Sequence, residues 1–252
     1  MISNKEVYRD IEFDYWAHSE NLSPQEKFLI ETYLDKNGKT LEAGTAGGRI
    51  LFGMQNLGFT SLYGFDYVAE FIEEARKKDT TGSICFSVED ATALNYKDCE
   101  FDQLVYLEQI ISSIEDEIGR LNAFKEAYRI LRKGGTAIFS FLNFHDRVKN
   151  PFYNLYLRYI KLLRIIYKSQ QTIQYIPRLK LCGKPNLNAL LDQQPYMYWY
   201  KVEEIYKLAT EVNFEIVALG SGFEVNQEIL HVSLGTLNQD MLQGMLYLVC
   251  KK

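Results

Sequence analysis

The chain has 252 residues, of which 47% are hydrophobic and 24% are charged, and its formal net charge at pH 7 is −5. This composition is ample for a buried core, and the acidic balance argues against nucleic acid as a partner. No apolar run approaches the roughly 20 residues that span a bilayer and no basic leader opens the chain, so we expect a cytoplasmic protein. The four cysteines lack Cys-x-x-Cys spacing, so no metal site or disulfide framework is predicted, and we expect reduced, mostly buried thiols.

The first 38 residues predict an aromatic segment followed by a helix. Residues 1–22 mix charged side chains with aromatic ones such as Tyr15 and Trp16, without a clean period. They either fold over a ligand as a lid or attach the N-terminus to the surface. Ser23 and Glu26 have the spacing of a capping box, which predicts that a helix begins there, and we expect it to end at Gly38.

A glycine turn between two expected strands is the feature around which the chain is organised. Residues 40–49 read TLEAGTAGGR, and Asp66 ends the next strand, 22 positions after Gly44. The turn needs glycine because backbone passes close to a ligand there and a helix packs tightly on the preceding strand. A carboxylate at the position of Asp66 can accept two hydrogen bonds from the hydroxyls of a ribose. The pattern predicts a nucleoside site.

The ligand of this site is indicated by departures from the dinucleotide fingerprint. Gly-x-Gly-x-x-Gly would place glycine where Ala46 and Arg49 stand. Glu42, near the end of the first strand, would repel a pyrophosphate but suits a ligand with ammonium and sulfonium charges. The stretch resembles the first motif of the class I S-adenosylmethionine-dependent methyltransferases, acid-x-Gly-x-Gly-x-Gly, which here reads Glu42, Gly44, Ala46 and Gly48. Ala46 is the departure from the family pattern, and we expect it to narrow the turn.

Three further stretches resemble motifs of the same family in the expected order. Residues 88–91 resemble the end of the third strand, where the family implies that Asp90 meets the adenine amine and Ala91 makes a backbone contact. Residues 101–107 resemble the fourth strand, and 129–135 resemble the helix end and turn before the fifth. The resemblance implies that S-adenosyl-L-methionine is the cofactor. The expected cofactor contacts are Tyr15, Glu42, Gly44, Thr45, Ala46, Gly48, Arg49, Asp66, Tyr67, Asp90, Ala91 and Leu107.

Strands and helices alternate along the chain. Strands are expected at 39–44, 60–66, 83–88, 102–107 and 135–142, with helices at 47–57, 68–78 and 115–132. Such alternation predicts a parallel sheet with helices on both faces. A closing helix at 202–212 and strands at 214–219 and 245–250 match the family's last elements. The expected fold class is therefore α/β: a seven-stranded Rossmann-like methyltransferase sheet, mostly parallel with an antiparallel last strand, plus a helical cap inserted after the fifth strand.

The composition changes abruptly after the fifth strand. Between Arg147 and Tyr200 stand nine basic residues and one acidic residue, a formal charge of +8 that leaves −13 for the rest of the chain. Residues 151–168 predict a helix, and four of its basic residues share one third of its circumference: Arg158, Lys161, Arg164 and Lys168. The segment is open to three interpretations: a packed helix with a solvated basic edge, a pocket for an anionic or aromatic substrate, or a surface that rests on anionic lipid.

These patterns divide the chain into three parts. Residues 1–22 are the expected lid segment, residues 23–146 and 201–252 form the expected cofactor-binding core, and residues 147–200 form a basic, aromatic substrate cap. We refer to residues 147–200 as the cap throughout. The pattern of residues 220–244 predicts no regular element.

Methyl transfer needs little from the protein's own side chains. It is an in-line displacement, so holding the acceptor on the line of the breaking bond, away from water, supplies most of the acceleration. If the acceptor is a hydroxyl, a base helps. His145, just past the fifth strand, is the best placed base, and Glu108, directly after the fourth strand, is second. Either residue could instead be a loop residue satisfied by solvent or backbone.

The sequence therefore predicts a methyltransferase for a small organic acceptor, with an oxygen nucleophile preferred over nitrogen or carbon, in an aromatic or anionic metabolite. A peripheral membrane enzyme that methylates a lipid or isoprenoid is the alternative enzyme, with the basic helix as an interfacial anchor. A non-catalytic protein that binds an adenosyl ligand or a nucleotide is the alternative from another class. The oligomeric state does not follow from the sequence.

Overall fold

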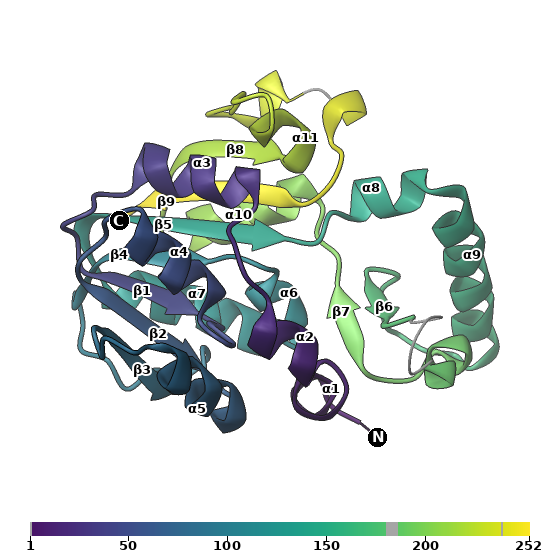
Figure 1. Ribbon diagram of the computed structural model, residues 1–252. Helices are drawn as coiled ribbons and strands as arrows, with labels where there is room; N and C mark the ends of the chain where they lie inside the picture. Colours follow the sequence, from purple (N-terminus) through teal and green to yellow (C-terminus); the bar gives the residue numbers. More distant parts are fainter. Residues whose placement is uncertain (1, 180–185, 238) are drawn as a thin grey trace.

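The computed structural model describes residues 2–179, 186–237 and 239–252 and places a seven-stranded sheet at the centre of the molecule (Figure 1). The strand order is β3-β2-β1-β4-β5-β9-β8. The first five strands run parallel, and β9 runs antiparallel to both of its neighbours, β5 and β8. The expected fold class is confirmed. The strands are β1 (Thr40–Ala43), β2 (Leu62–Asp66), β3 (Ile84–Val88), β4 (Phe101–Tyr106), β5 (Leu131–Phe141), β8 (Glu215–Ser221) and β9 (Leu246–Lys251).

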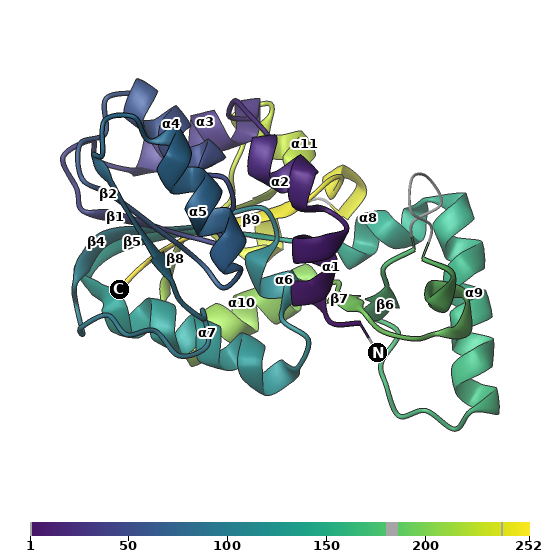
Figure 2. The same cartoon turned by 60° about the horizontal axis from the view of Figure 1, so that its bottom comes forward.

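Helices cover both faces of the sheet (Figure 2). One face packs against α7 (Glu117–Ile130) and α10 (Val202–Glu211). The other packs against α3 (Pro24–Tyr33), α4 (Arg49–Asn56) and α5 (Ala69–Lys78). Side chains of β5 alternate between the two cores, because Phe139 belongs to the first and Ile138 to the second. Both faces are buried, which accounts for the nearly continuous apolar strands.

Two predicted boundaries shift for local reasons. The capping box is present, since Ser23 accepts a hydrogen bond from the backbone of Glu26 while the Glu26 carboxylate accepts one from the backbone of Ser23. The helix that it begins, α3, ends at Tyr33 and not at Gly38, because residues 34–38 turn to enter β1. The fifth strand starts at Leu131, four residues earlier than expected, with an irregular register and Gly134 at a φ of +77°.

The cap follows β5 and contains both helices and strands. Its elements are α8 (Phe144–Lys149), α9 (Pro151–Ile166), β6 (Tyr175–Pro177), the 3₁₀ helix η1 (Leu187–Leu191) and β7 (Tyr196–Tyr198). β6 and β7 pair antiparallel, so the expected helical cap also carries a β-ribbon. It has its own small core of Tyr156, Leu157, Ile160 and Ile176. Lys180, Cys182 and Lys184, which the sequence analysis counted in this segment, lie outside the described residues.

The four basic residues at 158–168 differ in exposure: Arg158, Lys161 and Lys168 are exposed, and Arg164 is not. Arg164 is buried, and its guanidinium forms a two-pronged ion pair with Asp192 at 2.6 and 2.7 Å. The same guanidinium donates to the carbonyl oxygens of Thr172 and Tyr175 at 2.5 and 2.6 Å. The helical spacing of the basic residues does not reveal that one of them, Arg164, is buried and joins segments of the cap.

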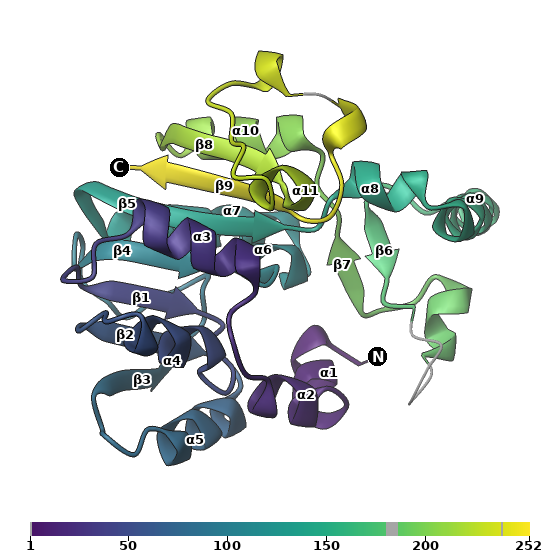
Figure 3. The same cartoon turned by 45° about the horizontal axis from the view of Figure 1, so that its top comes forward.

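The remaining elements lie at the two ends of the chain. At the N-terminus are α1 (Asn4–Asp10) and α2 (Phe13–His18), and α6 (Ile110–Ser113) follows β4. Between β8 and β9 lie α11 (Gly222–Val225) and the 3₁₀ turns η2 (Leu234–Thr236) and η3 (Gln239–Met241). This last region crosses one end of the sheet (Figure 3), where the imidazole Nε2 of His231 lies 3.0 Å from Glu224. The cysteines differ from expectation, because Cys85 and Cys99 are exposed and only Cys250 of the described three is buried.

Candidate active site

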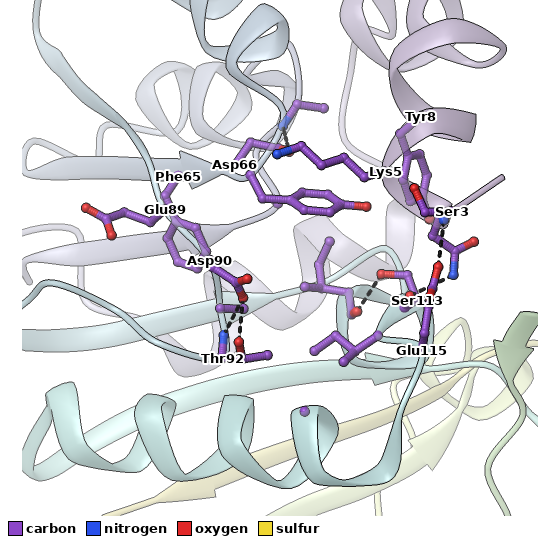
Figure 4. Close-up of a pocket in the computed structure, with 18 of the residues that line it drawn as sticks. Ser3, Lys5, Tyr8, Phe65, Asp66, Glu89, Asp90, Thr92, Ser113 and Glu115 are labelled. Atoms are coloured by element: carbon purple, nitrogen blue, oxygen red, sulfur yellow. Dashed lines mark hydrogen bonds between the residues drawn. The ribbon is translucent and has the colours of Figure 1, made fainter. Parts of the chain in front are cut away.

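A cavity of about 630 Å³ opens at the carboxyl ends of the first four strands. Its wall is formed by the turn after β1, the end of β2, the loops after β3 and β4, and α1 (Figure 4). This edge of a parallel sheet is where the strand order reverses and where such folds bind ligands. The structure brings seven of the predicted site residues to the cavity wall: Gly44, Ala46, Asp66, Tyr67, Asp90, Ala91 and Glu108.

Asp66 is held rigidly at the end of β2. One carboxylate oxygen accepts a hydrogen bond from the backbone N–H of Ala46 at 3.0 Å, and the other accepts one from Val68 at 2.9 Å. Each oxygen keeps a further lone pair, so two more donors can be accepted. Burial raises the pKa of Asp66 to about 6. The carboxylate is therefore ionised at neutral pH and suited to accept hydrogen bonds from a pair of hydroxyl groups.

The glycine turn brings backbone against the cavity. Gly44 has a φ of +64°, a conformation in which any side chain is strained, and a Cβ on it would also displace the end of the Ile110 side chain, 2.1 Å away. Ala46, where the family motif has glycine, has a φ of +45°. An alanine in this left-handed conformation is strained. The sequence departure is thus accommodated by backbone strain, with the turn preserved.

The loop after β3 places a second carboxylate on the wall. Asp90 accepts two hydrogen bonds from Thr92, one from the backbone N–H at 2.8 Å and one from the hydroxyl at 2.7 Å (Figure 4). Both use the same carboxylate oxygen, so the other is left to accept from a ligand in the cavity. Glu89 and Ala91 line the wall beside it.

The N-terminal helices close the cavity from the side opposite the sheet. Lys5, Tyr8 and Trp16 lie in the wall, whereas the side chain of Tyr15 is 66% exposed and does not line it. The family resemblance implies a lid role for both Tyr15 and Trp16, and only Trp16 lies in the wall. Their order on α2 decides which one faces inward. Lys5 and Tyr8 belong to the aromatic, charged stretch already noted, but nothing in the sequence indicates Ser113 or Glu115, which also line the wall.

Comparison with known proteins finds a family model that matches the part of the chain around this site. Residues 41–139, which span β1 to β5, match the family model described as "Methyltransferase domain". This core is therefore a methyltransferase domain, consistent with the class I S-adenosylmethionine-dependent family. The match supports S-adenosyl-L-methionine as its cofactor. A search of curated proteins found no match.

Several solved structures share the fold of this methyltransferase over nearly its whole length. An S-adenosylmethionine-dependent methyltransferase from Methanosarcina mazei is 18% identical with a TM-score of 0.67, covering 92% of this chain and 98% of that one. One from Thermotoga maritima, described as a possible histamine N-methyltransferase, is 17% identical with a TM-score of 0.58, at 99% and 97% coverage. The [4+2]-cyclase SpnF is 12% identical with a TM-score of 0.61, at 100% and 97% coverage. At such identities the likeness concerns the fold alone.

The other predicted cofactor contacts of the methyltransferase lie behind the cavity wall or outside it. These are Tyr15, Glu42, Thr45, Gly48, Arg49 and Leu107. Glu42 is buried under the turn, where it accepts a hydrogen bond from the Thr45 hydroxyl at 2.6 Å. Burial raises the pKa of Glu42 to about 8, so at neutral pH most of it carries no charge. The sequence analysis expected a negative charge at Glu42, whereas burial favours the neutral form of this side chain.

Arg49 belongs to a charged cluster that joins α3, α4 and the loop after β4. Its guanidinium lies 2.6 Å from the carboxylate of Glu26 and 3.2 Å from that of Glu108. Glu108 reaches the cavity wall from this cluster and has a φ of +55°, followed by Gln109 at +69°. Burial and the neighbouring Glu26 carboxylate raise the pKa of Glu108 to about 7. Two consecutive residues in a strained conformation at a cavity wall point to a functional constraint.

His145, the first base candidate, lines neither of the cavities described here. It lies in α8, where its backbone N–H donates to the Asn143 side chain that caps the helix. Its ring nitrogen Nε2 is buried and has no hydrogen-bond partner among the described residues. The structure thus separates the two predicted bases and places only Glu108 at the cofactor cavity. Among the described residues, no group of three His, Cys, Asp or Glu side chains is arranged to hold a metal ion.

A second cavity of about 530 Å³ lies where α1, the loop after β4 and the cap meet. Its wall is mostly apolar and includes Ile11, Leu142, Met197 and Trp199. Gln109 lines it, whereas the residues on either side, Glu108 and Ile110, line the cofactor cavity. α1 is shared in the same way, with Asn4, Lys5 and Tyr8 on one cavity and Val7 and Ile11 on the other. The two cavities therefore lie on opposite sides of one thin wall.

Two arginines reach the second cavity, and they differ in their partners. Arg178 forms an ion pair with Glu12 at 2.6 Å, which ties the cap to the N-terminal helices. Arg147 forms no ion pair with any of the described residues, and its buried Nε has no hydrogen-bond partner. Its guanidinium lies over the rings of Tyr153 and Trp199, at 3.0 and 4.3 Å from their centroids. It is a cation held in place by aromatic rings beside a cavity.

Proposed function

We propose that this methyltransferase acts on a small organic acceptor that carries an anionic group, held in the second cavity while the cofactor occupies the first. The observation that supports this most directly is the shared wall at residues 108–110, with the unpaired Arg147 on the acceptor side. An oxygen nucleophile is preferred and nitrogen is the second choice. The acceptor's nucleophile would reach the methyl group through this wall, so α1 or the loop at 108–110 must move during the reaction.

The residues around the first cavity fit the cofactor. Asp66 would accept hydrogen bonds from the ribose hydroxyls, and Asp90 would meet the exocyclic amine of the adenine. The backbone at Gly44 would lie against the methionine part of the cofactor, in a conformation that favours glycine. Trp16 and Tyr8 would cover it from the lid. When bound, S-adenosylmethionine supplies an electrophilic methyl group on a sulfonium.

Arg147 would orient the acceptor. A guanidinium presents its donors in a flat fork that matches a carboxylate or phosphate, and this one forms no ion pair within the described part of the chain. The rings of Tyr153 and Trp199 hold it from one side, so little side-chain entropy is lost on binding. The apolar remainder of the wall would bind the body of the acceptor, because pockets combine apolar surface with a few fixed polar groups.

Most of the rate acceleration would come from positioning and from exclusion of water. Glu108 would act as the base for a hydroxyl acceptor, since it alone of the two predicted bases lines the cofactor cavity and its pKa is raised to about 7. His145, half-buried in α8 and outside both cavities, would act on the acceptor only through other groups. This reverses the order in which the sequence analysis ranked them.

Incubation with methyl-labelled S-adenosylmethionine and a metabolite extract, followed by mass spectrometry of labelled products, tests the proposal. The expected product is a small acid that carries the label on oxygen or nitrogen. A labelled lipid in the organic phase would favour the membrane-dissolved acceptor instead. Cofactor binding without any labelled product, in extracts from several growth conditions, would favour the non-catalytic alternative.

A further inference from the structure

The long helix of the cap exposes a continuous apolar stripe. We define the α9 stripe as Phe152, Leu155, Tyr159, Leu162 and Ile166, whose spacing of three, four, three and four residues places them on one side of the helix. Their exposures are 53%, 69%, 41%, 55% and 61%. The opposite side, with Tyr156 and Ile160, is buried in the cap core. The core of the cap is therefore complete without the side chains of the α9 stripe, which remain available to contact another surface.

The apolar surface continues beyond the helix. The 3₁₀ helix η1 packs beside α9, and the Tyr159 hydroxyl donates a hydrogen bond to the carbonyl oxygen of Leu190 at 2.7 Å. Leu187, Leu190 and Leu191 of η1 are also exposed. In two views α9 forms the outermost edge of the molecule, on the side away from the central sheet (Figures 1 and 3). Exposed apolar surface of this extent marks an interaction site on a folded protein.

The charges beside the stripe have a single sign. Arg158 and Lys161 of α9 are exposed and lie together along one flank of the stripe, and the exposed Lys168 follows just after the end of the helix. From Arg147 to Leu191 the sequence contains no Asp or Glu. The nearest acid in sequence on the C-terminal side, Asp192, is neutralised within the cap by Arg164. A surface that supplies negative charge would complement this flank, because residues 147–191 contain no acid and Asp192 is paired with Arg164.

We propose that α9 lies on an anionic lipid bilayer, with its stripe among the acyl chains and its basic flank at the headgroups. An interfacial helix combines an apolar face with Lys and Arg beside it. A second copy of the chain is a weaker candidate, because packing two such stripes would bring two basic flanks together without an acid between them. The inference does not depend on the acceptor, since α9 lies outside both cavities.

Co-sedimentation of the full chain with vesicles tests this placement. The wild type should sediment with vesicles that contain 30% phosphatidylserine and stay in solution with pure phosphatidylcholine vesicles. Arg158→Glu with Lys161→Glu should weaken binding at least about 25-fold, since each basic residue contributes about fivefold near such a surface. Leu155→Glu with Leu162→Glu should abolish binding. All variants should bind S-adenosylhomocysteine as the wild type does.

Two matched controls separate the stripe from general effects. Lys27→Glu with Lys207→Glu makes the same change in net charge at exposed residues of α3 and α10, and should leave vesicle binding within twofold. Val232→Glu replaces an equally exposed apolar residue outside the cap and should also have no effect. Equal binding to neutral vesicles, or equal losses in the controls, would overturn the proposal. A dimer in sedimentation velocity that Leu155→Glu with Leu162→Glu converts to a monomer would overturn it in favour of self-association.

Discussion

The carboxylate of Asp66 accepts a hydrogen bond from the backbone N–H of Ala46 at 3.0 Å, and this contact joins the end of β2 to the turn after β1. It fixes the position of the turn although Ala46 occupies a left-handed conformation at a φ of +45°. The two residues thereby act as one unit. The acid that is expected to meet the cofactor also holds the backbone that the cofactor would approach.

Ala46→Gly should raise the free energy of unfolding by about 0.5–1 kcal/mol. The left-handed conformation costs alanine about 1–2 kcal/mol, and the greater freedom of glycine in the unfolded chain offsets part of that gain. Chemical denaturation of the ligand-free protein measures the change. Ala69→Gly, at a residue without a positive φ, serves as the control and should not stabilise. Destabilisation by Ala46→Gly would show that the turn is not strained.

Trp16→Ala should weaken binding of S-adenosylhomocysteine at least about tenfold, because the side chain lies in the wall of the cofactor cavity. Tyr15→Ala, one residue away, should leave binding within twofold because its ring points into solvent. Calorimetry on the two variants separates a lid from an aromatic surface attachment. Equal effects, or a larger effect at Tyr15, would mean that α2 turns when the ligand binds.

The sequence predicted the sheet better than the residues that surround it. The strand ends with Asp66, Asp90 and Glu108 could be located because parallel strands finish at one edge and the motif spacings are regular. Glu42 and Arg49 could not be placed from spacing, since their roles depend on neighbours far away in the chain, such as Glu26. The position of Glu42 or Arg49 in the fold determines whether its side chain contacts the ligand or instead supports a loop that contacts the ligand.

Glu108 should make the stability of the protein depend on pH near neutrality. Its pKa in the folded protein is raised to about 7 by burial and by Glu26, from an ordinary value near 4.5. The protonated form is therefore favoured in the folded state, and the stability that this provides is complete below pH 4.5 and lost as pH rises through about 7. Relative to Glu108→Gln, the melting temperature of the wild type should fall between pH 5 and pH 8. A difference in melting temperature between the two proteins that does not change with pH would exclude a raised pKa for Glu108.

Arg147→Gln should raise the KM for the acceptor at least about tenfold and leave cofactor affinity unchanged, because it removes a charged partner of the acceptor alone. Arg158→Gln removes a charge from the exposed face of the same cap and should leave the KM within twofold. Steady-state kinetics with the labelled acceptor measure both. An unchanged KM in Arg147→Gln would show that the guanidinium only packs against Tyr153 and Trp199.

In the cap, the sequence pattern predicts the helix but not which of its basic residues are buried. Residues 151–168 were expected to be helical, and α9 covers most of that range. Four basic residues on a helix look alike in sequence, yet Arg164 is buried against Asp192 while Arg158 is exposed. The partner lies 28 residues further along, in a segment without a helical or strand pattern. Only the fold of the cap distinguishes the structural arginine from those that are free to meet a ligand or a membrane.

The most direct test of the cofactor site is calorimetric titration of S-adenosylhomocysteine into the wild type and Asp66→Ala. If Asp66 accepts both ribose hydroxyls, the substitution should cost about 1.5–3 kcal/mol, or roughly 10- to 150-fold in Kd. Because burial raises the pKa of Asp66 to about 6, wild-type affinity should also fall as pH drops through 6, and Asp66→Asn should lose that dependence. Equal affinity of the wild type and Asp66→Ala, with no change in wild-type binding between pH 5 and pH 8, would contradict the assignment of this cavity to the cofactor.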